Sequence, residues 1–372
     1  MVMTGRSAGI RFMAIAAVLF VAVGAVSPLF SDCSDATAEV TVVDGYGKVF
    51  TFTDEPSHVV TIGKGITATV IQLGGIHKIV VADSYSRTDN NSIFDPLRTQ
   101  IDSGKTVANG NIYGGSTALT TDIVYAADNH LFDRESDPVF ITGGNSYIQP
   151  IVESLVNNGF KKVMAWNDIT EYSDIPDFVS TISKILDGTE SDLVTQMRHT
   201  SDVIEAGILG HTVREAFYVT YSGGVFKVGN TNSLANSMIS AAGGLSVTTD
   251  DSKAKPTYEA NITTLVIEHP DAIIFIDNSI NSNEAQLNSL KSAIGTDSYD
   301  RVVPLNPLWN NYSVESMNGI WTMACAMYPD LFSGDVPGID KSTQDNIVVY
   351  FSVSSIAALA ICVGGVVFLR RA

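Results

Sequence analysis

The feature that most constrains the fold of this chain is a long helical pattern at its centre, residues 174–210. Its apolar residues recur at the three- and four-residue spacing of an amphipathic helix, and they are Phe178, Ile182, Ile185, Leu186, Leu193, Met197, Ile204 and Ile208. Residues 187–188 interrupt the pattern, and Thr189, with Asp192 three residues later, forms a capping box. The sequence therefore predicts a short helix and then one of about 20 residues, roughly 30 Å long, that ends at Gly210.

Short apolar runs typical of buried strands alternate with helical patterns on both sides of this segment. These runs are residues 58–62, 78–82, 122–126, 139–142 and 162–165 before it, and residues 214–221, 272–277 and 301–305 after it. Such alternation is typical of parallel α/β sheets covered by helices. We therefore expect two Rossmann-like α/β lobes, residues 39–173 and 211–334, joined by a single long helix. The alternative, one more surface helix of a single domain, stays open.

Composition and charge limit what the chain can do. Its 372 residues and 45% hydrophobic content suffice for two ordinary domains with sizeable cores. The net charge of −18 argues against nucleic acid as a partner, because phosphate backbones need a basic surface. The three cysteines are too few for a disulfide framework. The six histidines are scattered without a metal-ligand spacing, so no metal site is expected.

Both ends of the chain carry uncharged apolar runs. Residues 1–38 combine two arginines, an apolar stretch and a small-residue cleavage site, which indicates a signal peptide or an N-terminal anchor. Residues 347–369 follow a polar stem at 335–346, carry no charge and suffice for a transmembrane helix. Because Arg370 and Arg371 come next, the positive-inside rule predicts a single-pass protein of the cell membrane with a cytoplasmic C-terminus and extracellular lobes.

Landmarks along the chain resemble those of one known family. They are an Asp-x-x-Gly hairpin (44–47), a Pro-x-x-Val-Val strand (56–60), Leu-Gly before Val-Val (73–81), a break before the central helix (186–190), Ala-Gly-Gly (242–244), His-Pro-Asp (269–271) and Tyr-Pro-Asp-Leu-Phe (328–332). In this order they are similar to the substrate-binding proteins of iron–siderophore, haem and cobalamin ABC importers. The resemblance implies two α/β lobes joined by one rigid helix. It also implies a non-enzymatic function, the capture of a metal chelate for an ABC permease.

The chain departs from that family in two respects. The glutamates with which the lobes of these proteins dock on the permease would fall near Gly114 and Thr263, and neither is acidic. Residues 86–112 and 128–148 are longer and more polar than typical loops, as insertions would be. The existence of a cognate permease is therefore open. The alternatives are a chelatase-like two-lobed enzyme and a surface protein without a transport function.

Ligands of open α/β sheets bind beyond the carboxyl ends of the strands, so side chains at these positions are candidate binding residues. They are Lys64, Tyr85 and Trp166 in the first lobe and Tyr221, Trp309, Asn310 and Tyr312 in the second. Trp166 and Trp309 are favoured, because both follow strands directly and flat aromatic faces suit a macrocycle or a catecholate. No resident cofactor is expected, and the ligand would be an iron or cobalt chelate. The alternative is that these rings pack inside their own lobes.

Overall fold

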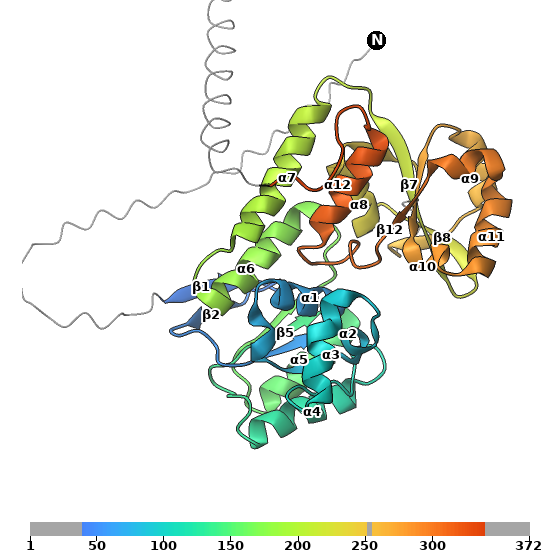
Figure 1. Ribbon diagram of the computed structural model, residues 1–372. Coiled ribbons are helices and arrows are strands. Elements are labelled where there is room, and N and C mark those ends of the chain that lie inside the picture. The colour runs from blue at the N-terminus through green and yellow to red at the C-terminus, as the bar shows by residue number, and fades with distance from the viewer. Residues whose placement is uncertain (1–38, 251–254, 339–372) are drawn as a thin grey trace, which may run out of the picture. The chain divides into compact units, whose positions relative to one another are not determined.

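The computed structural model describes residues 39–250 and 255–338 (Figure 1). The predicted signal peptide or anchor at 1–38 and the predicted transmembrane helix at 347–369 lie outside these residues. Most of the predicted stem, residues 335–346, lies outside them as well. Within the described ranges, no helix has both the length and the apolar character needed to cross a bilayer.

Within the described residues, the first lobe is built on a sheet of four parallel strands in the order β4-β3-β5-β6. These strands are β3 (Val59–Ile62), β4 (Ile79–Ala82), β5 (Val139–Thr142) and β6 (Val163–Trp166). Every residue in them is buried. Continuous apolar runs are buried in a parallel sheet because helices cover both of its faces. The runs that the sequence analysis assigned to these four strands are confirmed.

Helices lie on both faces of this sheet. They are α1 (Lys64–Gln72) and α6 (Ile175–Asp187) on one face, and α4 (Ser116–Asp128) and α5 (Asn145–Asn157) on the other. A short antiparallel hairpin of β1 (Val40–Val43) and β2 (Val49–Phe52) packs beside α6. This hairpin is the one that Asp44-Gly45 predicts.

The strand expected at residues 122–126 is wrong, because these residues belong to α4. In that helix Leu119, Ile123 and Ala126 are buried at helical spacing against the sheet. A short apolar run does not distinguish a strand from the buried face of a helix, and here the helical pattern already begins at Ser116.

The expected insertion at residues 86–112 folds into short helices in this structure. Its helices are the end of α2 (Ser84–Thr88), η2 (Ser92–Phe94) and α3 (Asp95–Asp102), whereas η1 (Gly75–Lys78) precedes β4. Phe94 and Leu97 are fully buried, so the segment is anchored to the lobe and contributes to its core.

The segment between the two sheets contains two consecutive helices and not one long helix. It forms η3 (Tyr172–Asp174), α6 (Ile175–Asp187) and α7 (Asp192–Ile208). Gly188 ends α6 in the left-handed region at φ +69°, which confirms the predicted break. The residue that caps α7 is Ser191, whose side chain accepts a hydrogen bond from the amide of Leu193 at 3.2 Å, and not Thr189 as predicted. Gly210 follows α7 with φ +82°, the left-handed geometry expected of a helix end.

Ion pairs brace the break between α6 and α7. The guanidinium of Arg198 lies 2.9 Å from Asp177 of α6 and 2.7 Å from Glu190 in the connection. Glu190 also accepts a hydrogen bond from Ser180. This hydrogen bond and the neighbouring Arg198 lower the pKa of Glu190, so its carboxylate holds the two helices together across the physiological pH range.

In the part of the chain that the structure describes, the second lobe contains a mixed sheet of six strands, in the order β10-β8-β7-β11-β12 with β9 beside β7. The strands are β7 (Arg214–Ser222), β8 (Val225–Gly229), β9 (Gly244–Ser246), β10 (Thr257–Glu259), β11 (Ile273–Asp277) and β12 (Val302–Leu305). The pairs β7–β11 and β11–β12 are parallel, as expected, whereas β8 and β10 run antiparallel at one edge. The sequence analysis missed these two edge strands, which are partly exposed and therefore lack a continuous apolar run.

Helices again lie on both faces of the sheet. They are α8 (Leu234–Ala241) and α12 (Ser316–Met327) on one face, with α9 (Ile262–Glu268), α10 (Asn278–Asn281), α11 (Glu284–Ile294) and η4 (Thr296–Arg301) on the other side. The result is a second three-layer α/β lobe (Figure 1).

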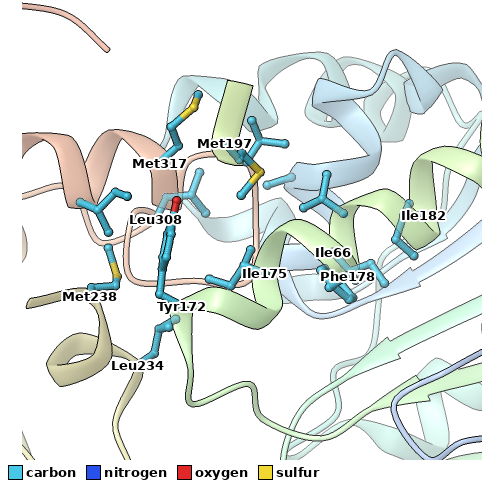
Figure 2. Close-up of a cluster of buried hydrophobic side chains, with 14 of the residues drawn as sticks. Ile66, Tyr172, Ile175, Phe178, Ile182, Met197, Leu234, Met238, Leu308 and Met317 are labelled. Atoms are coloured by element: carbon cyan, nitrogen blue, oxygen red, sulfur yellow. The ribbon is translucent and has the colours of Figure 1, made fainter. Parts of the chain in front are cut away.

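The two lobes share one hydrophobic core around α6 and α7. Figure 2 shows Ile66 of α1, Phe178 of α6, Met197 of α7, Met238 of α8 and Met317 of α12 gathered in this core. Met317 is the most exposed of these side chains, at 5%. Because separating the lobes would expose this apolar surface to water, the shared core holds them together.

Candidate ligand-binding site

A cavity of about 600 Å³ lies where the carboxyl ends of strands from both sheets meet. On the side of the first lobe it is lined by Lys64, which begins α1 just after β3, and by Asn167 and Asp168, which follow β6. On the side of the second lobe it is lined by Asp277, the last residue of β11, and by the loop after β12. Open α/β sheets bind their ligands at this place in the fold.

One hydrogen bond joins the two walls of the cavity. The hydroxyl of Tyr312, in the loop after β12, donates to Oδ1 of Asp168 at 2.9 Å. Burial raises the pKa of Tyr312 far above its ordinary value, and the nearby carboxylate of Asp168 raises it further. The phenol therefore stays neutral at physiological pH and acts as a donor.

The loop that carries Tyr312 lies unusually close to α1. A β-carbon added at Gly65 would lie 3.1 Å from the backbone nitrogen and 3.1 Å from the backbone oxygen of Tyr312, so glycine at this position permits the approach. The hydroxyl of Thr69, one turn further along α1, donates to the same carbonyl at 3.3 Å. These contacts hold the Tyr312 side chain at the wall of the cavity.

The charged side chains give the cavity an acidic character. Among the described residues that line it, three are charged: Lys64, Asp168 and Asp277. The ammonium of Lys64 lies 2.8 Å from the carboxylate of Asp89, which offsets its charge. Asp277 accepts a hydrogen bond from the amide of Ser279 at 2.8 Å, whereas no cation neutralises Asp168 among the hydrogen bonds and ion pairs of the described residues.

The remaining polar groups of the cavity are neutral amides and hydroxyls. They include Asn167, Asn310 and Tyr218, of which Tyr218 is almost completely buried. Burial raises the pKa of Tyr218 far above its ordinary value, and the neighbouring Asp277 contributes in the same direction. The cavity therefore offers hydrogen bonds from neutral groups together with the negative charge of its carboxylates.

Trp166 does not line this cavity and lies in the core of the first lobe, where it is 6% exposed. Its ring meets Phe178 of α6 edge-on at a centroid distance of 5.2 Å. The β1–β2 hairpin covers its other side, and a β-carbon added at Gly45 would lie 2.8 Å from both Cα and Cδ1 of Trp166. The Trp166 ring is therefore not in the cleft, where we expected it. It packs inside its own lobe, which was the alternative.

Trp309 is half-buried against the shared core and does not line the cavity either. Its indole Nε1 donates to Glu315 at 3.1 Å. The other carboxylate oxygen of Glu315 accepts from the side chain of Gln72 in α1 at 2.7 Å. Trp309 thus takes part in a polar contact between the lobes beside the cavity, because the loop after β12 turns its ring toward α12.

The two other predicted tyrosines also lie outside the cavity. Tyr221 packs against Phe226 across the β7–β8 hairpin, with ring centroids 5.1 Å apart. Tyr85 is exposed at the first turn of α2, with its ring 6.0 Å from that of Tyr113. Of the seven predicted residues, the structure brings Lys64, Asn310 and Tyr312 together.

Sequence reasoning missed the acidic residues of the cavity, Asp168 and Asp277. A signal for both was present, since Asp277 ends a predicted strand and Asp168 lies three residues beyond another. The sequence analysis favoured Trp166 instead, because aromatic side chains suit a flat ligand. In the ranges that the structure describes, no group of three or more His, Cys, Asp or Glu side chains could hold a metal ion.

The chain therefore has two α/β lobes, one on a parallel sheet and one on a mixed sheet, with a cavity at the carboxyl ends of their parallel strands. No protein-family model matches the chain, and no curated protein matches its sequence. Solved structures do match its fold. CeuE of Helicobacter pylori with Ni(II) bound is 14% identical with a TM-score of 0.55, over 79% of this chain and 90% of that chain.

Two proteins of Vibrio cholerae are similar to the same extent. The periplasmic vitamin B12-binding protein BtuF is 14% identical with a TM-score of 0.54, over 73% of this chain and 97% of that chain. The periplasmic heme-binding protein HutB is 13% identical with a TM-score of 0.54, over 73% of this chain and 99% of that chain. The chain thus has the fold of these periplasmic binding proteins, which confirms the resemblance.

Proposed function

We propose that this protein captures a metal chelate in the cavity between its lobes. The observation that supports this most is the position of the cavity, at the carboxyl edges of both sheets, where Lys64, Asn310 and Tyr312 meet Asp168. Its volume of about 600 Å³ falls within the usual range of small-molecule sites. A sizeable organic ligand would fill it without a large rearrangement of the lobes.

The proposed class of ligand rests on the ligands of the solved structures with a similar fold. The similar structures hold or are named for Ni(II), vitamin B12 and heme. A ferric siderophore, a haem or a cobalamin is therefore the proposed ligand here, with the metal brought by the chelate.

The lobes move little in this proposal. The segment of α6 and α7 would join lobes of residues 39–173 and 211–334, and the ion pairs of Arg198 brace its break. The shared core adds to the resistance against a large rotation. Structures with and without ligand that differ by a large domain rotation would contradict this.

The proposed location is the outer face of a cell membrane, where the chain would deliver its ligand to an ABC permease. This rests on the uncharged residues 347–369 and on Arg370 and Arg371 after them. Protease treatment of intact cells should release a fragment that ends near residue 345. Protection of residues 39–340 in intact cells would overturn this topology.

The binding function is tested by spectroscopic titration of the full chain with haem, a cobalamin and a ferric siderophore. At least one should bind with a shift in its absorption spectrum. Tyr312→Ala, which removes a side chain from the cavity wall, should weaken that binding by about tenfold or more. Tyr125→Ala, on the exposed surface of α4, is the matched control and should change nothing. A folded protein that binds none of the three chelates would refute the proposal.

A further inference from the structure

Three tyrosines that neither the fold nor its core requires stand together at the edge of the first sheet. Tyr85, Tyr113 and Tyr147 are 42%, 52% and 46% exposed. The rings of Tyr113 and Tyr147 meet at 76° with centroids 4.9 Å apart, and Tyr85 lies 6.0 Å from Tyr113 on the other side. We call these three residues the tyrosine rim. Large aromatic side chains are costly to leave in water, so a contiguous exposed group of them marks a binding surface.

Local structure holds the tyrosine rim in place. Asp83 caps α2 by accepting a hydrogen bond from the amide of Tyr85 at 2.7 Å. Asn111 does the same for the turn that carries Tyr113, accepting from its amide at 3.0 Å. Tyr147 lies in the first turn of α5, directly after β5. Each tyrosine therefore follows the carboxyl end of a strand or a turn tied to it, on the same edge as the cavity.

Asp168 connects the tyrosine rim to the cavity. A β-carbon added at Gly144 would lie 3.5 Å from Oδ2 of Asp168 and 3.5 Å from the ring of Tyr147, so the carboxylate and this ring flank the same point. The other oxygen of Asp168 accepts the hydrogen bond from Tyr312 inside the cavity. Burial raises the pKa of Tyr113, and the carboxylates of Asp168 and then Asp83 raise it further, which agrees with their proximity.

The combination of aromatic faces and carboxylates selects the charge of a ligand. The faces of tyrosine rings carry partial negative charge and attract cations, and organic ammonium groups are the ligands commonly recognised in this way. Asp168 adds a full negative charge at the inner end of the tyrosine rim, and Asp277 adds another across the cavity. The positive charge of Lys64 is offset by Asp89. An anionic ligand would meet repulsion from both carboxylates without a free cation among the lining residues described.

We propose that the tyrosine rim and Asp168 bind the positively charged face of the ligand, so that this site takes a cation of low charge density and rejects anionic chelates. The cation is a cationic metal chelate or an organic ammonium compound. This inference rests on the proposed function for the assignment of the cavity as the binding site, and it narrows the proposed chelates to those without a net negative charge. Neutral amides such as Asn310 then supply hydrogen bonds to the remainder of the ligand.

The test uses calorimetric titration of the full chain with three probes. Tricationic tris(bipyridine)cobalt(III) and trianionic ferric tris(catecholate) are propeller-shaped complexes of similar size and opposite charge, and tetraethylammonium is an organic cation without a metal. The cationic complex should bind at least about tenfold more tightly than the anionic one, and its affinity should fall as salt is added. Binding by tetraethylammonium alone would support the tyrosine rim as an ammonium site and would overturn the metal chelate of the proposed function.

Variants separate the aromatic face from the hydroxyl group. Tyr113→Phe keeps the ring and should retain the affinity for the cation, whereas Tyr113→Leu should lose about three- to tenfold. Asp168→Asn keeps an acceptor for the hydroxyl of Tyr312 but removes the charge, and should weaken binding by about tenfold. Tyr125→Leu and Asp271→Asn are controls for a lost exposed ring and a lost exposed charge away from the cavity. Thermal melts of each variant establish that it is folded.

Two results would overturn the inference. In one, ferric tris(catecholate) binds more tightly than the cobalt complex. In the other, Tyr113→Phe loses as much affinity as Tyr113→Leu, which would assign the binding to the phenol oxygen. In either case the chelate-binding function would survive if Tyr312→Ala still weakened binding. If no probe, haem, cobalamin or siderophore binds the folded chain, the proposed function and the inference fail together.

Discussion

The two tryptophans Trp166 and Trp309 and the three tyrosines of the tyrosine rim have opposite environments, although both sets follow the carboxyl ends of strands. Trp166 is buried under the β1–β2 hairpin and α6, and Trp309 is half-buried against Glu315 and the shared core. The rings of Tyr85, Tyr113 and Tyr147 are between 42% and 52% exposed. A position at the end of a strand places a residue near the ligand edge of the sheet, but other segments decide whether its side chain reaches solvent.

The difference has a physical cause in the segments that cover each ring. Gly45 leaves room for the indole of Trp166 at a distance where any β-carbon would clash, so the hairpin closes over it. No comparable segment among the described residues covers the tyrosine rim. The tryptophans therefore serve the stability of the fold, and the tyrosines are free to serve binding. Four substitutions test this division.

The largest effect is expected from Trp166→Ala. Removing a buried indole leaves a cavity beneath the hairpin and should lower the free energy of unfolding by about 3–5 kcal/mol. Chemical denaturation measures the loss. Titration of the folded variant with whichever chelate the natural protein binds should give an unchanged affinity. A variant with full stability and weakened binding would place Trp166 in the ligand site and would reverse the comparison.

Asp83→Asn should remove the pH dependence of the free energy of unfolding that comes from the Asp83 carboxyl, next to the tyrosine rim. Burial raises the pKa of the Asp83 carboxyl from its ordinary 3.8 to about 6. Between these values the folded protein keeps a proton that the unfolded chain has released, so stability falls as pH rises through this window. The expected loss is about 2–3 kcal/mol between pH ~4 and ~6. Urea denaturation at several pH values should show this decline in the natural protein and a flatter profile in the variant; equal profiles would contradict the assignment.

Trp309→Phe should have a smaller effect, because it keeps the ring but removes the hydrogen bond from Nε1 to Glu315. A hydrogen bond to a charged group contributes about 1–3 kcal/mol, and Glu315 retains its bond from Gln72. We therefore expect a loss of about 1–2 kcal/mol in the free energy of unfolding, measured by thermal and chemical denaturation. Chelate affinity should stay constant. A large loss of affinity instead would show that Trp309 contacts the ligand.

The smallest effect on stability is expected from Tyr147→Leu. Its ring is 46% exposed and contacts Tyr113 edge-on, so the free energy of unfolding should change by less than about 1 kcal/mol. The affinity for a cationic ligand should fall nevertheless. Denaturation and titration of the same preparation measure both quantities. A stability loss comparable to that of Trp166→Ala would mean that the tyrosine rim is structural, and the division between the two aromatic sets would fail.

Much of the architecture was accessible from the sequence because the relevant signals are local. Apolar runs predict the four strands of the first sheet, which are buried on both faces, and the three parallel strands of the second, of which β7 and β11 are buried at their centres. The break at Gly188 is equally local, because a glycine in the left-handed region ends a helix without strain. The prediction failed at residues 122–126, where a five-residue apolar run fits both a strand and the face of α4, and at the partly exposed strand β8.

By itself the sequence determined the alternation of strands and helices that builds the two α/β lobes, and it predicted the edge of the sheets as the place for a ligand. These depend on residue spacing within one element and on the rule that parallel strands present their carboxyl ends together. Only the tertiary structure decided which side chains stand at the cavity: Lys64, Asp168, Asn310 and Tyr312, with Trp166 excluded. The exposure of a side chain depends on contacts between segments far apart in the chain. Gly45 packs closely over Trp166, and Gly65 lets the backbone of Tyr312 approach α1. No local sequence pattern predicts such contacts.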